Sequence, residues 1–130
     1  MNIKVDELTN AVINQTELYR AMLQENIDEV FEQVGNKALA EIKAKSQSAG
    51  FNDRKYSKGW TKVSEKNKVT GVYHVTIHNK KYYRLTHLLE KGHALPNGGR
   101  TRAFPHIAPV QADMDELIVK EITEAIEGTQ

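Results

Sequence analysis

The segment TELYRAMLQENIDEVFEQVGNKALAEIKAKS, residues 16–46, decides the fold because its apolar residues return every three or four positions. This spacing predicts an amphipathic helix with one apolar stripe. The stripe consists of Tyr19, Leu23, Ile27, Val30, Phe31, Val34, Ala38 and Ile42. At about 1.5 Å per residue the helix is about 45 Å long. Gly35 within it indicates a bend or a close packing contact.

A shorter helix is expected before this long one. Val5, Leu8 and Val12 also follow helical spacing. The polar run Asn-Gln-Thr at residues 14–16 predicts an interruption between the two helices.

A pair of strands is expected after the long helix. Residues 56–63 and 69–78 have the composition of strands, and the polar residues 64–68 between them form a turn. In the second strand apolar and polar residues alternate, so one face of the strand is apolar and the other is polar. Its inward face consists of Tyr73, Val75 and Ile77. This pattern predicts an antiparallel hairpin with one solvated face.

The remaining third of the chain predicts two helices separated by a glycine-rich loop. The first is short, with Gly92 as a left-handed cap. Its buried face consists of Tyr82, Leu85, Leu88 and Leu89. The loop at residues 93–102 leads through Pro105 to a terminal helix that starts at Pro109. The expected fold class is therefore α+β: a long N-terminal helix, a small antiparallel β-sheet, a short middle helix and a C-terminal helix.

The composition of the chain excludes several kinds of site and argues against a membrane protein. The chain has 130 residues, which suits a single domain over residues 1–130. It has no cysteine, which excludes a disulfide framework, a thiolate zinc site and a cysteine nucleophile. No apolar run approaches the roughly 20 residues that span a bilayer, and the start MNIKVDELTN lacks the core of a signal peptide. We therefore expect synthesis in the cytoplasm and no membrane contact.

Charge is unevenly distributed along the chain. Residues 1–50 hold five Lys or Arg against eight Asp or Glu, a net −3. Residues 51–106 hold twelve against three, a net +9, together with all five histidines. Residues 107–130 hold one against six, a net −5. A basic middle between acidic ends can bind polyanions or the acidic face of a neighbouring copy, or it can simply be a solvated surface.

The histidines raise the possibility of a metal site. His87, His93, Asn97 and His106 follow the order found in metal-dependent nucleases, which need a histidine base beside a bound metal. Only one carboxylate, Glu90, lies between the outer two histidines, and the region reads as a helix where such nucleases have a hairpin. Structural histidines are therefore the favoured interpretation. His74 and His78 on one strand lie about 13 Å apart, too far for one ion.

Two further motifs suggest nucleic acid or nucleotide binding. The NGGR sequence at residues 97–100 matches neither of the two nucleotide-binding motifs, GxGxxG and GxxxxGK(S/T). An extended proline-containing stretch follows it, where a nucleotide loop would be followed by a helix. Nucleotide binding is rejected on that ground. Trp60 lies between Lys58 and Lys62, with Tyr56 two residues before Lys58, and such strands can stack on single-stranded bases. A half-buried strand whose aromatic residues pack in the core fits the same pattern, and this interpretation is preferred.

The sequence YYRLTHLLEKGHALPNGGRTRAFPHIAPV, residues 82–110, resembles the small tail-component family of tailed phages. Family members combine a helix ending in Leu-Glu-x-Gly, a variable loop and a Pro-His-Ile-x-Pro element before a terminal helix. The matching residues are Leu89, Glu90, Gly92 and His93, followed by Pro105, His106, Ile107 and Pro109. YSKGW at residues 56–60 is similar to the first strand of the family.

The resemblance implies a structural protein of the virion, without catalytic residues, metal or cofactor. Such proteins act in the neck or complete the tail where it meets the head, with other neck and tail proteins as partners. Charge segregation favours a homo-oligomeric ring. We expect the loop to contact neighbouring proteins or to line the DNA channel through His93, Asn97, Arg100 and Arg102. Glu90 is expected to pair with Arg100 or Arg102. The alternatives are a nucleic-acid-binding module and a metal-dependent nuclease.

Overall fold

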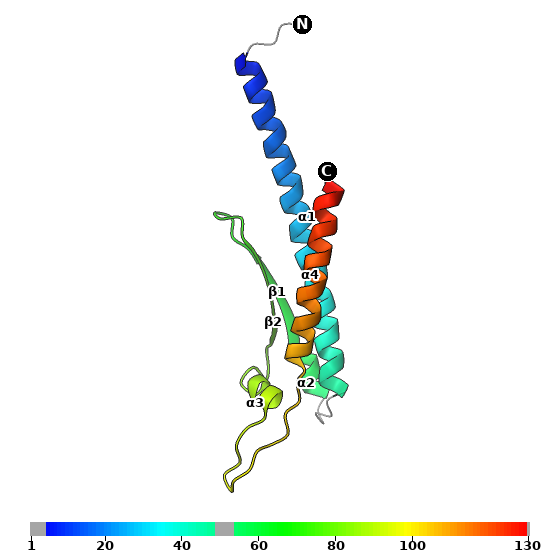
Figure 1. Cartoon of the computed structure of the whole chain (residues 1–130). Coiled ribbons are helices and arrows are strands. Elements are labelled where there is room, and N and C mark those ends of the chain that lie inside the picture. Colours follow the sequence, from blue (N-terminus) through cyan, green and yellow to red (C-terminus); the bar gives the residue numbers. More distant parts are fainter. Residues whose placement is uncertain (1–4, 49–53, 130) are drawn as a thin grey trace.

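A computed structural model describes residues 5–48 and 54–129 of the chain (Figure 1). The elements are the helices α1 (Val5–Ser48) and α2 (Arg54–Lys58), the strands β1 (Trp60–Lys66) and β2 (Tyr73–Asn79), and the helices α3 (Thr86–Lys91) and α4 (Ile107–Thr129). This order confirms the α+β prediction. None of the helices in the described ranges is both long and apolar enough to cross a membrane.

Helix α1 is continuous over 44 residues, so the predicted interruption at residues 14–16 is wrong. The hydroxyl of Thr16 donates to the carbonyl oxygen of Val12 at 2.9 Å, and Thr9 donates to Val5 at the same distance. These bonds keep the threonine side chains within the helix instead of competing with it. At about 1.5 Å per residue, α1 is about 66 Å long.

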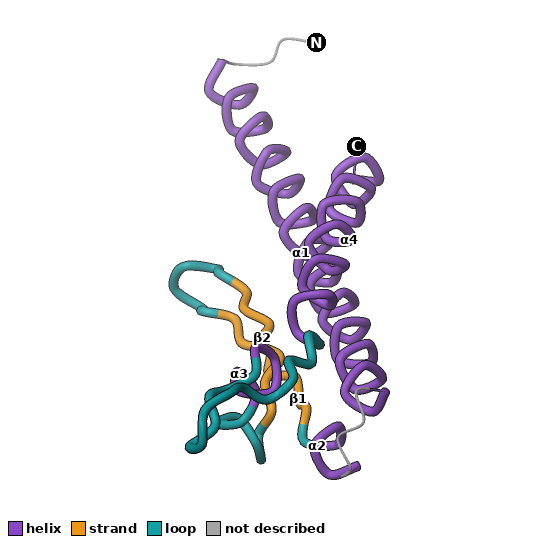
Figure 2. The backbone as a smooth tube through the Cα atoms, turned by 60° about the horizontal axis from the view of Figure 1, so that its bottom comes forward, coloured by secondary structure: helices purple, strands orange, loops and turns teal. Residues whose placement is uncertain are grey.

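Helix α4 lies antiparallel to α1 and covers only part of it. It starts beside the C-terminal end of α1 and ends near the middle of that helix (Figure 1). The hairpin packs against the same half of α1, as Figure 2 shows from another side. The hydrophobic core therefore lies at this end of the molecule. Its buried residues are Ala38, Ile42, Tyr56, Trp60 and Val110, surrounded by Leu39, Ile77, Tyr82, Leu89, Ile107 and Met114.

The hairpin pairs β1 with β2 in antiparallel register, from Trp60 opposite Asn79 to Lys66 opposite Tyr73. Along β2, burial alternates as predicted, with the half-buried side turned toward α1. A Cβ atom added to Gly35 would lie 2.6 Å from Cγ1 of Val75. Of the two alternatives for Gly35, close packing is therefore confirmed.

Two ion pairs join the hairpin to α1 outside the core. The ammonium of Lys62 lies 2.6 Å from a carboxylate oxygen of Glu32, and that of Lys66 lies 2.7 Å from Asp28. The hydroxyl of Tyr73 donates to the other oxygen of Glu32. These contacts hold the hairpin along α1 at a partly solvated edge.

The predicted strand over residues 56–63 starts too early. Residues 54–58 form the short helix α2, and the strand begins at Trp60. A strand would have pointed Lys58 to the same side as Tyr56 and Trp60, whereas one helical turn leaves Lys58 exposed and buries Ser57 instead. The buried amide of Asn79 closes this corner by donating to the carbonyl oxygen of Tyr56 at 2.9 Å.

The short middle helix forms over Thr86–Lys91, later than the apolar pattern suggested. Tyr82 and Leu89 pack against the core as predicted. Leu85 is 45% exposed, so its predicted burial is wrong. Residues 80–85 form turns that start on Asn79, whose side-chain oxygen accepts from the backbone N–H of Tyr82 at 2.8 Å.

Candidate partner-binding arm and its anchor

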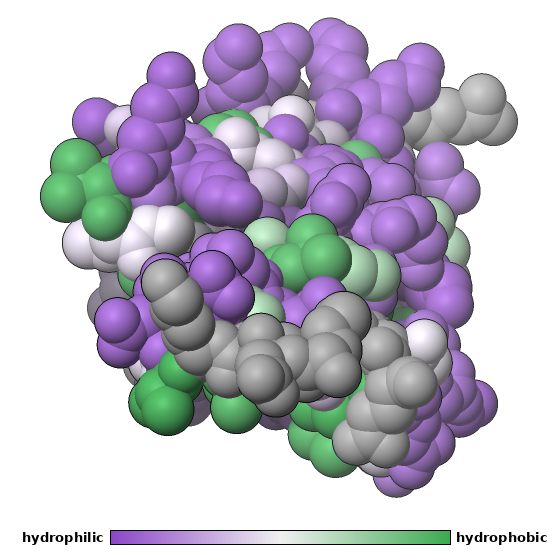
Figure 3. Space-filling model, turned by 90° about the horizontal axis from the view of Figure 1, so that it is seen from above, coloured by the Kyte–Doolittle hydropathy of each residue, from purple (hydrophilic) through white to green (hydrophobic). Residues whose placement is uncertain are grey.

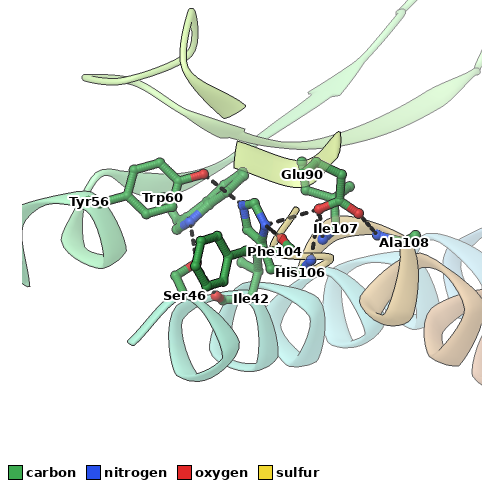
Figure 4. Close-up of polar contacts among 9 residues, drawn as sticks. All are labelled: Ile42, Ser46, Tyr56, Trp60, Glu90, Phe104, His106, Ile107 and Ala108. Atoms are coloured by element: carbon green, nitrogen blue, oxygen red, sulfur yellow. Dashed lines mark hydrogen bonds and ion pairs between the residues drawn. The ribbon is translucent and has the colours of Figure 1, made fainter. Parts of the chain in front are cut away.

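His106 occupies the centre of a buried polar cluster at the core end of the molecule (Figure 4). Its side chain is 1% exposed. Ring atom Nδ1 lies 2.7 Å from the carbonyl oxygen of Phe104 and 3.0 Å from a carboxylate oxygen of Glu90. Since both are acceptors, Nδ1 carries the hydrogen. Ring atom Nε2 lies 2.7 Å from the hydroxyl of Tyr56.

Tyr56 completes this chain of contacts as a hydrogen-bond donor. Burial, with the negative charge of Glu90, raises the pKa of Tyr56 to about 12. The phenol therefore stays protonated and can donate to Nε2 of the neutral ring. The Tyr56–His106–Glu90 chain thus links α2, α3 and the start of α4.

Glu90 caps the start of α4 from another element. Its carboxylate accepts the backbone N–H groups of His106 and Ile107 at 2.7 Å each and that of Ala108 at 3.0 Å. Pro109 follows and has no N–H. The four N–H groups that a helix start leaves without internal partners are therefore all accounted for. Burial raises the pKa of Glu90, but the three backbone N–H bonds and the nearby His106 outweigh it, so the pKa is lowered.

This capping corrects two predictions. The expected pairing of Glu90 with Arg100 or Arg102 is wrong, because the carboxylate is used at the start of α4. Helix α4 begins at Ile107, so Pro109 is its third residue and not its first. The cap satisfies the N–H groups one residue after another, and the helix can therefore start before the proline.

Trp60 and Ser46 connect this cluster to α1. The indole N–H of Trp60 donates to the hydroxyl oxygen of Ser46 at 2.9 Å, and that hydroxyl donates to the carbonyl oxygen of Ile42 at 2.6 Å. The rings of Tyr56, Trp60 and His106 meet edge to face, with centroids 5.7–6.1 Å apart. We call Ser46, Tyr56, Trp60, Glu90 and His106 the anchor. Burial of both aromatic residues confirms the core interpretation over base stacking.

The arm, residues 93–102, projects from the anchor at the bottom of Figure 1. It is a paired ribbon and not the open loop that was expected. The backbone N–H of Thr101 donates to the carbonyl oxygen of His93 at 2.9 Å, and the N–H of His93 donates to the Thr101 hydroxyl at 2.9 Å. Ala94 and Arg100 form a β-bridge, and the N–H of Leu95 donates to the carbonyl of Gly99 at 3.0 Å near the tip.

Gly92 joins the arm to α3 in a conformation that favours glycine. Its φ of 74° confirms a positive value, but its ψ of 171° is extended and does not give the predicted left-handed cap. An added Cβ atom would lie 2.5 Å from the carbonyl oxygen of Thr101. The two sides of the arm can therefore approach at its base only when this residue is glycine.

The sequence-predicted site residues fall into two groups. His93, Asn97, Arg100 and Arg102 are all exposed on the arm. The motif residues Leu89, Glu90, Gly92, Pro105, His106 and Pro109 surround its base. Sequence reasoning missed Tyr56 and Ser46 as partners of this group, because no spacing relates residues so distant in the chain.

The arginines on the arm contact its own base. Arg100 donates to the carbonyl oxygen of Gly92 at 3.4 Å, and the guanidinium of Arg102 lies 5.6 Å from the ring centre of Phe104. Both side chains remain exposed, so a partner can still reach their charges. The arm thus offers two fixed cations on a ribbon whose base is anchored in the core.

The histidine arrangement gives no metal centre within the described residues. Both ring nitrogens of His106 are engaged with Tyr56, Glu90 and Phe104. Over residues 5–48 and 54–129, no group of three or more His, Cys, Asp or Glu side chains is placed to hold a metal ion.

Comparison with known families places the chain among phage proteins. Residues 10–92 match the HK97-gp10-like family, described as "Bacteriophage HK97-gp10, putative tail-component". The match covers α1 from Asn10 onward, α2, the hairpin and α3, and it ends at Gly92, so the arm lies beyond it. Neither the curated proteins nor the solved structures gave a match. The chain belongs to the HK97-gp10-like family of phage tail components.

Proposed function

We propose that this tail component acts at the head–tail interface, as a neck or tail-completion protein, and that it does so without catalysis. The observation that carries the proposal is the arm. Its cations are exposed, while its base is fixed by a buried cap on α4 and by Gly92. An element that is rigid at its root and exposed at its tip suits contact with a neighbouring virion protein or with DNA in the channel.

Several features support a binding role over an enzymatic one. The polar groups of the anchor are all engaged in holding α1, α2, α3 and α4 together. The core combines residues of α1 and α4, the first and last helices, which supports residues 1–130 acting as one domain. We propose that the protein is synthesised in the host cytoplasm and is then incorporated into the virion.

We also propose a homo-oligomeric ring. Residues 107–130 carry a net charge of −5 and residues 51–106 a net +9. Acidic side chains of α4 are exposed, among them Asp115, Glu116, Glu124 and Glu127. Lysines of the basic segment, residues 51–106, are also exposed, among them Lys58, Lys68 and Lys80. Heterologous contact between such surfaces closes into a ring when the rotation permits.

Deletion of the gene from its phage tests the head–tail role. We expect filled heads and finished tails that stay unjoined in electron micrographs, with infectivity restored by the protein supplied in trans. Normal virions from the deletion phage would refute the role.

A double substitution tests the arm. Arg100→Ala with Arg102→Ala removes both cations while leaving the backbone pairing of the arm intact. We expect normal folding and a loss of virion assembly. The matched control is Lys68→Ala with Lys91→Ala, which removes two exposed charges outside the arm. Unchanged infectivity of the arginine variant would show that the arm takes no part in the interface.

A second candidate function, contact with DNA, has its own observation. Lys58, Lys80 and Lys81 line one open pocket of about 570 Å³ beside the backbone of Gly59. Three lysines that each neutralise one phosphate give a slope of about −3 for log affinity against log salt. Fluorescence anisotropy with a DNA duplex measures this slope, and Lys58→Ala is expected to reduce it by about one. Absence of binding at low salt would dispose of this candidate.

A further inference from the structure

The N-terminal part of α1 extends beyond every other helix and strand of the described chain. It stands free in Figure 1, above the end of α4. Every residue from Val5 to Met22 is exposed, whereas Leu23 and the residues after it begin to be covered. We call residues 5–22 the overhang. At about 1.5 Å per residue it is about 27 Å long.

The overhang exposes more apolar surface than a solvated helix needs. Its large apolar residues, with their exposed fractions, are Val5 78%, Leu8 54%, Val12 57%, Ile13 53%, Leu18 58%, Tyr19 40% and Met22 49%. Figure 3 looks down on this end and shows apolar patches among the hydrophilic side chains. The overhang therefore has the properties of a surface that a partner covers.

Most of these residues lie on one seam. Val5, Leu8, Val12, Tyr19 and Met22, with Gln15 between them, are separated alternately by three and four residues. This is the spacing of the contact positions in a coiled coil. Leu18 lies beside the seam, and Ile13 lies on the opposite side and takes no part. The spacing indicates a second helix as the partner.

Charges are absent from the flanks of the seam. The flanking positions nearest to it are Thr9, Ala11, Thr16 and Leu18. The ionised residues of the overhang, Asp6, Glu7, Glu17 and Arg20, all lie at positions that face away from the seam at about 100° per residue. Two helices of the same acidic sequence can therefore pack together without bringing like charges into contact.

Gln15 identifies the kind of helix that fits. It is the one polar residue in a seam that otherwise presents apolar side chains. In a parallel pair of identical helices in register, Gln15 meets Gln15. A side-chain amide both donates and accepts, so it is complementary to its own copy. A single polar residue in a seam also fixes the register of the pair.

We infer that the overhangs of neighbouring copies pack side by side, in parallel, along this seam. The parallel direction rests on the ring proposed above, because copies related by rotation about one axis point the same way. Each contact strip is narrow compared with the roughly 800 Å² per partner of a standard interface. The overhang contact is therefore weak alone and acts together with the rest of the ring.

Single cysteine substitutions test this inference, because the chain has no cysteine of its own. Leu8→Cys puts a thiol on the seam, and Asn10→Cys puts one on the opposite face of the same turn. Both variants should unfold at the wild-type temperature, because neither side chain contacts the core. Under mild oxidation of the purified protein, Leu8→Cys is expected to form interchain disulfides about tenfold faster than Asn10→Cys, since the seam raises the local concentration of like residues.

Equal rates for the two variants would overturn the inference. That result would mean that the seam is covered by a different protein, by antiparallel helices or by nothing. The head–tail role is judged separately, by the appearance of the deletion phage. Equal rates for the two cysteine variants, together with unjoined heads and tails in the deletion phage, would thus refute the seam contact and still support the head–tail role.

Discussion

The two ends of α1 lie in opposite surroundings. At the C-terminal end, Ile42 and Ser46 are buried, and the Ser46 hydroxyl is engaged as both donor and acceptor. At the N-terminal end, Val5 is 78% exposed and every residue from Val5 to Met22 is exposed. One continuous helix thus completes the core at one end and presents an apolar face at the other. Folding and assembly are therefore assigned to different parts of the molecule, and substitutions can separate them.

The largest effect on folding is expected at Glu90. Glu90→Ala removes the acceptor of three backbone N–H groups and of His106 at a position where the side chain is 11% exposed. Loss of a buried charged partner costs about 3–5 kcal/mol of unfolding free energy. Urea denaturation measures it. Glu90→Gln keeps one acceptor oxygen and should lose less. A loss below about 1 kcal/mol would mean that the cap contributes little.

The next effect is expected at the root of the arm. Gly92→Ala introduces both an unfavourable positive φ and an overlap with the carbonyl of Thr101. Gly98→Ala, at φ +84°, has the same conformational cost and no atom within 4 Å. The conformational cost is about 1–2 kcal/mol, and the overlap adds about 1–3 kcal/mol at Gly92 alone. Thermal unfolding of both variants measures the difference. Equal losses would show that the root of the arm is open.

A smaller effect is expected at Tyr56. Tyr56→Phe keeps the ring contacts but leaves Nε2 of His106 without its donor. An unsatisfied buried group costs about 1–3 kcal/mol. Denaturation at neutral pH measures the loss, and Tyr83→Phe at an exposed position serves as the control. A neutral outcome at Tyr56 would indicate that the Nε2 contact does not stabilise the anchor.

The smallest effect depends on pH and concerns the hairpin edge. Hydrogen bonds from Lys62, Ser64 and Tyr73 lower the pKa of Glu32 from its ordinary 4.5 to about 2. Because the folded pKa is lower, this stabilisation is complete above about pH 4.5 and is lost as the pH falls toward 2. Glu32→Gln should flatten the acid limb of the stability profile. An unchanged slope in that window would show that the contact is not formed in solution.

Sequence patterns predicted the elements that depend on local spacing. The long helix follows from the apolar repeat through Val30, Val34, Ala38 and Ile42, and the hairpin follows from the alternation through Tyr73, Val75 and Ile77. The connection at residues 93–102 followed from its glycines, but its pairing as a ribbon did not. These features are read within a window of a few residues, so they need no knowledge of the rest of the fold.

Features that depend on distant partners were not predictable. The helical turn at Tyr56 is held by Asn79, which lies 23 residues further along. The partner of Glu90 was assigned to nearby arginines, whereas its carboxylate accepts the three backbone N–H groups of residues 106–108 and forms a helix cap that no sequence pattern records. The continuity of α1 past residues 14–16 was likewise not predicted, because exposed polar residues do not by themselves end a helix.

Hydrogen–deuterium exchange tests the division between folding and assembly most directly. In the free protein at low concentration, the amides of residues 106–108 and of Val110 should exchange slowly, and those of the overhang and the arm should exchange fast. In intact virions the overhang and the arm should become protected, while the core end stays as it was. Overhang amides as slow as those of the core in the free protein, or equally fast in free protein and virion, would contradict the account.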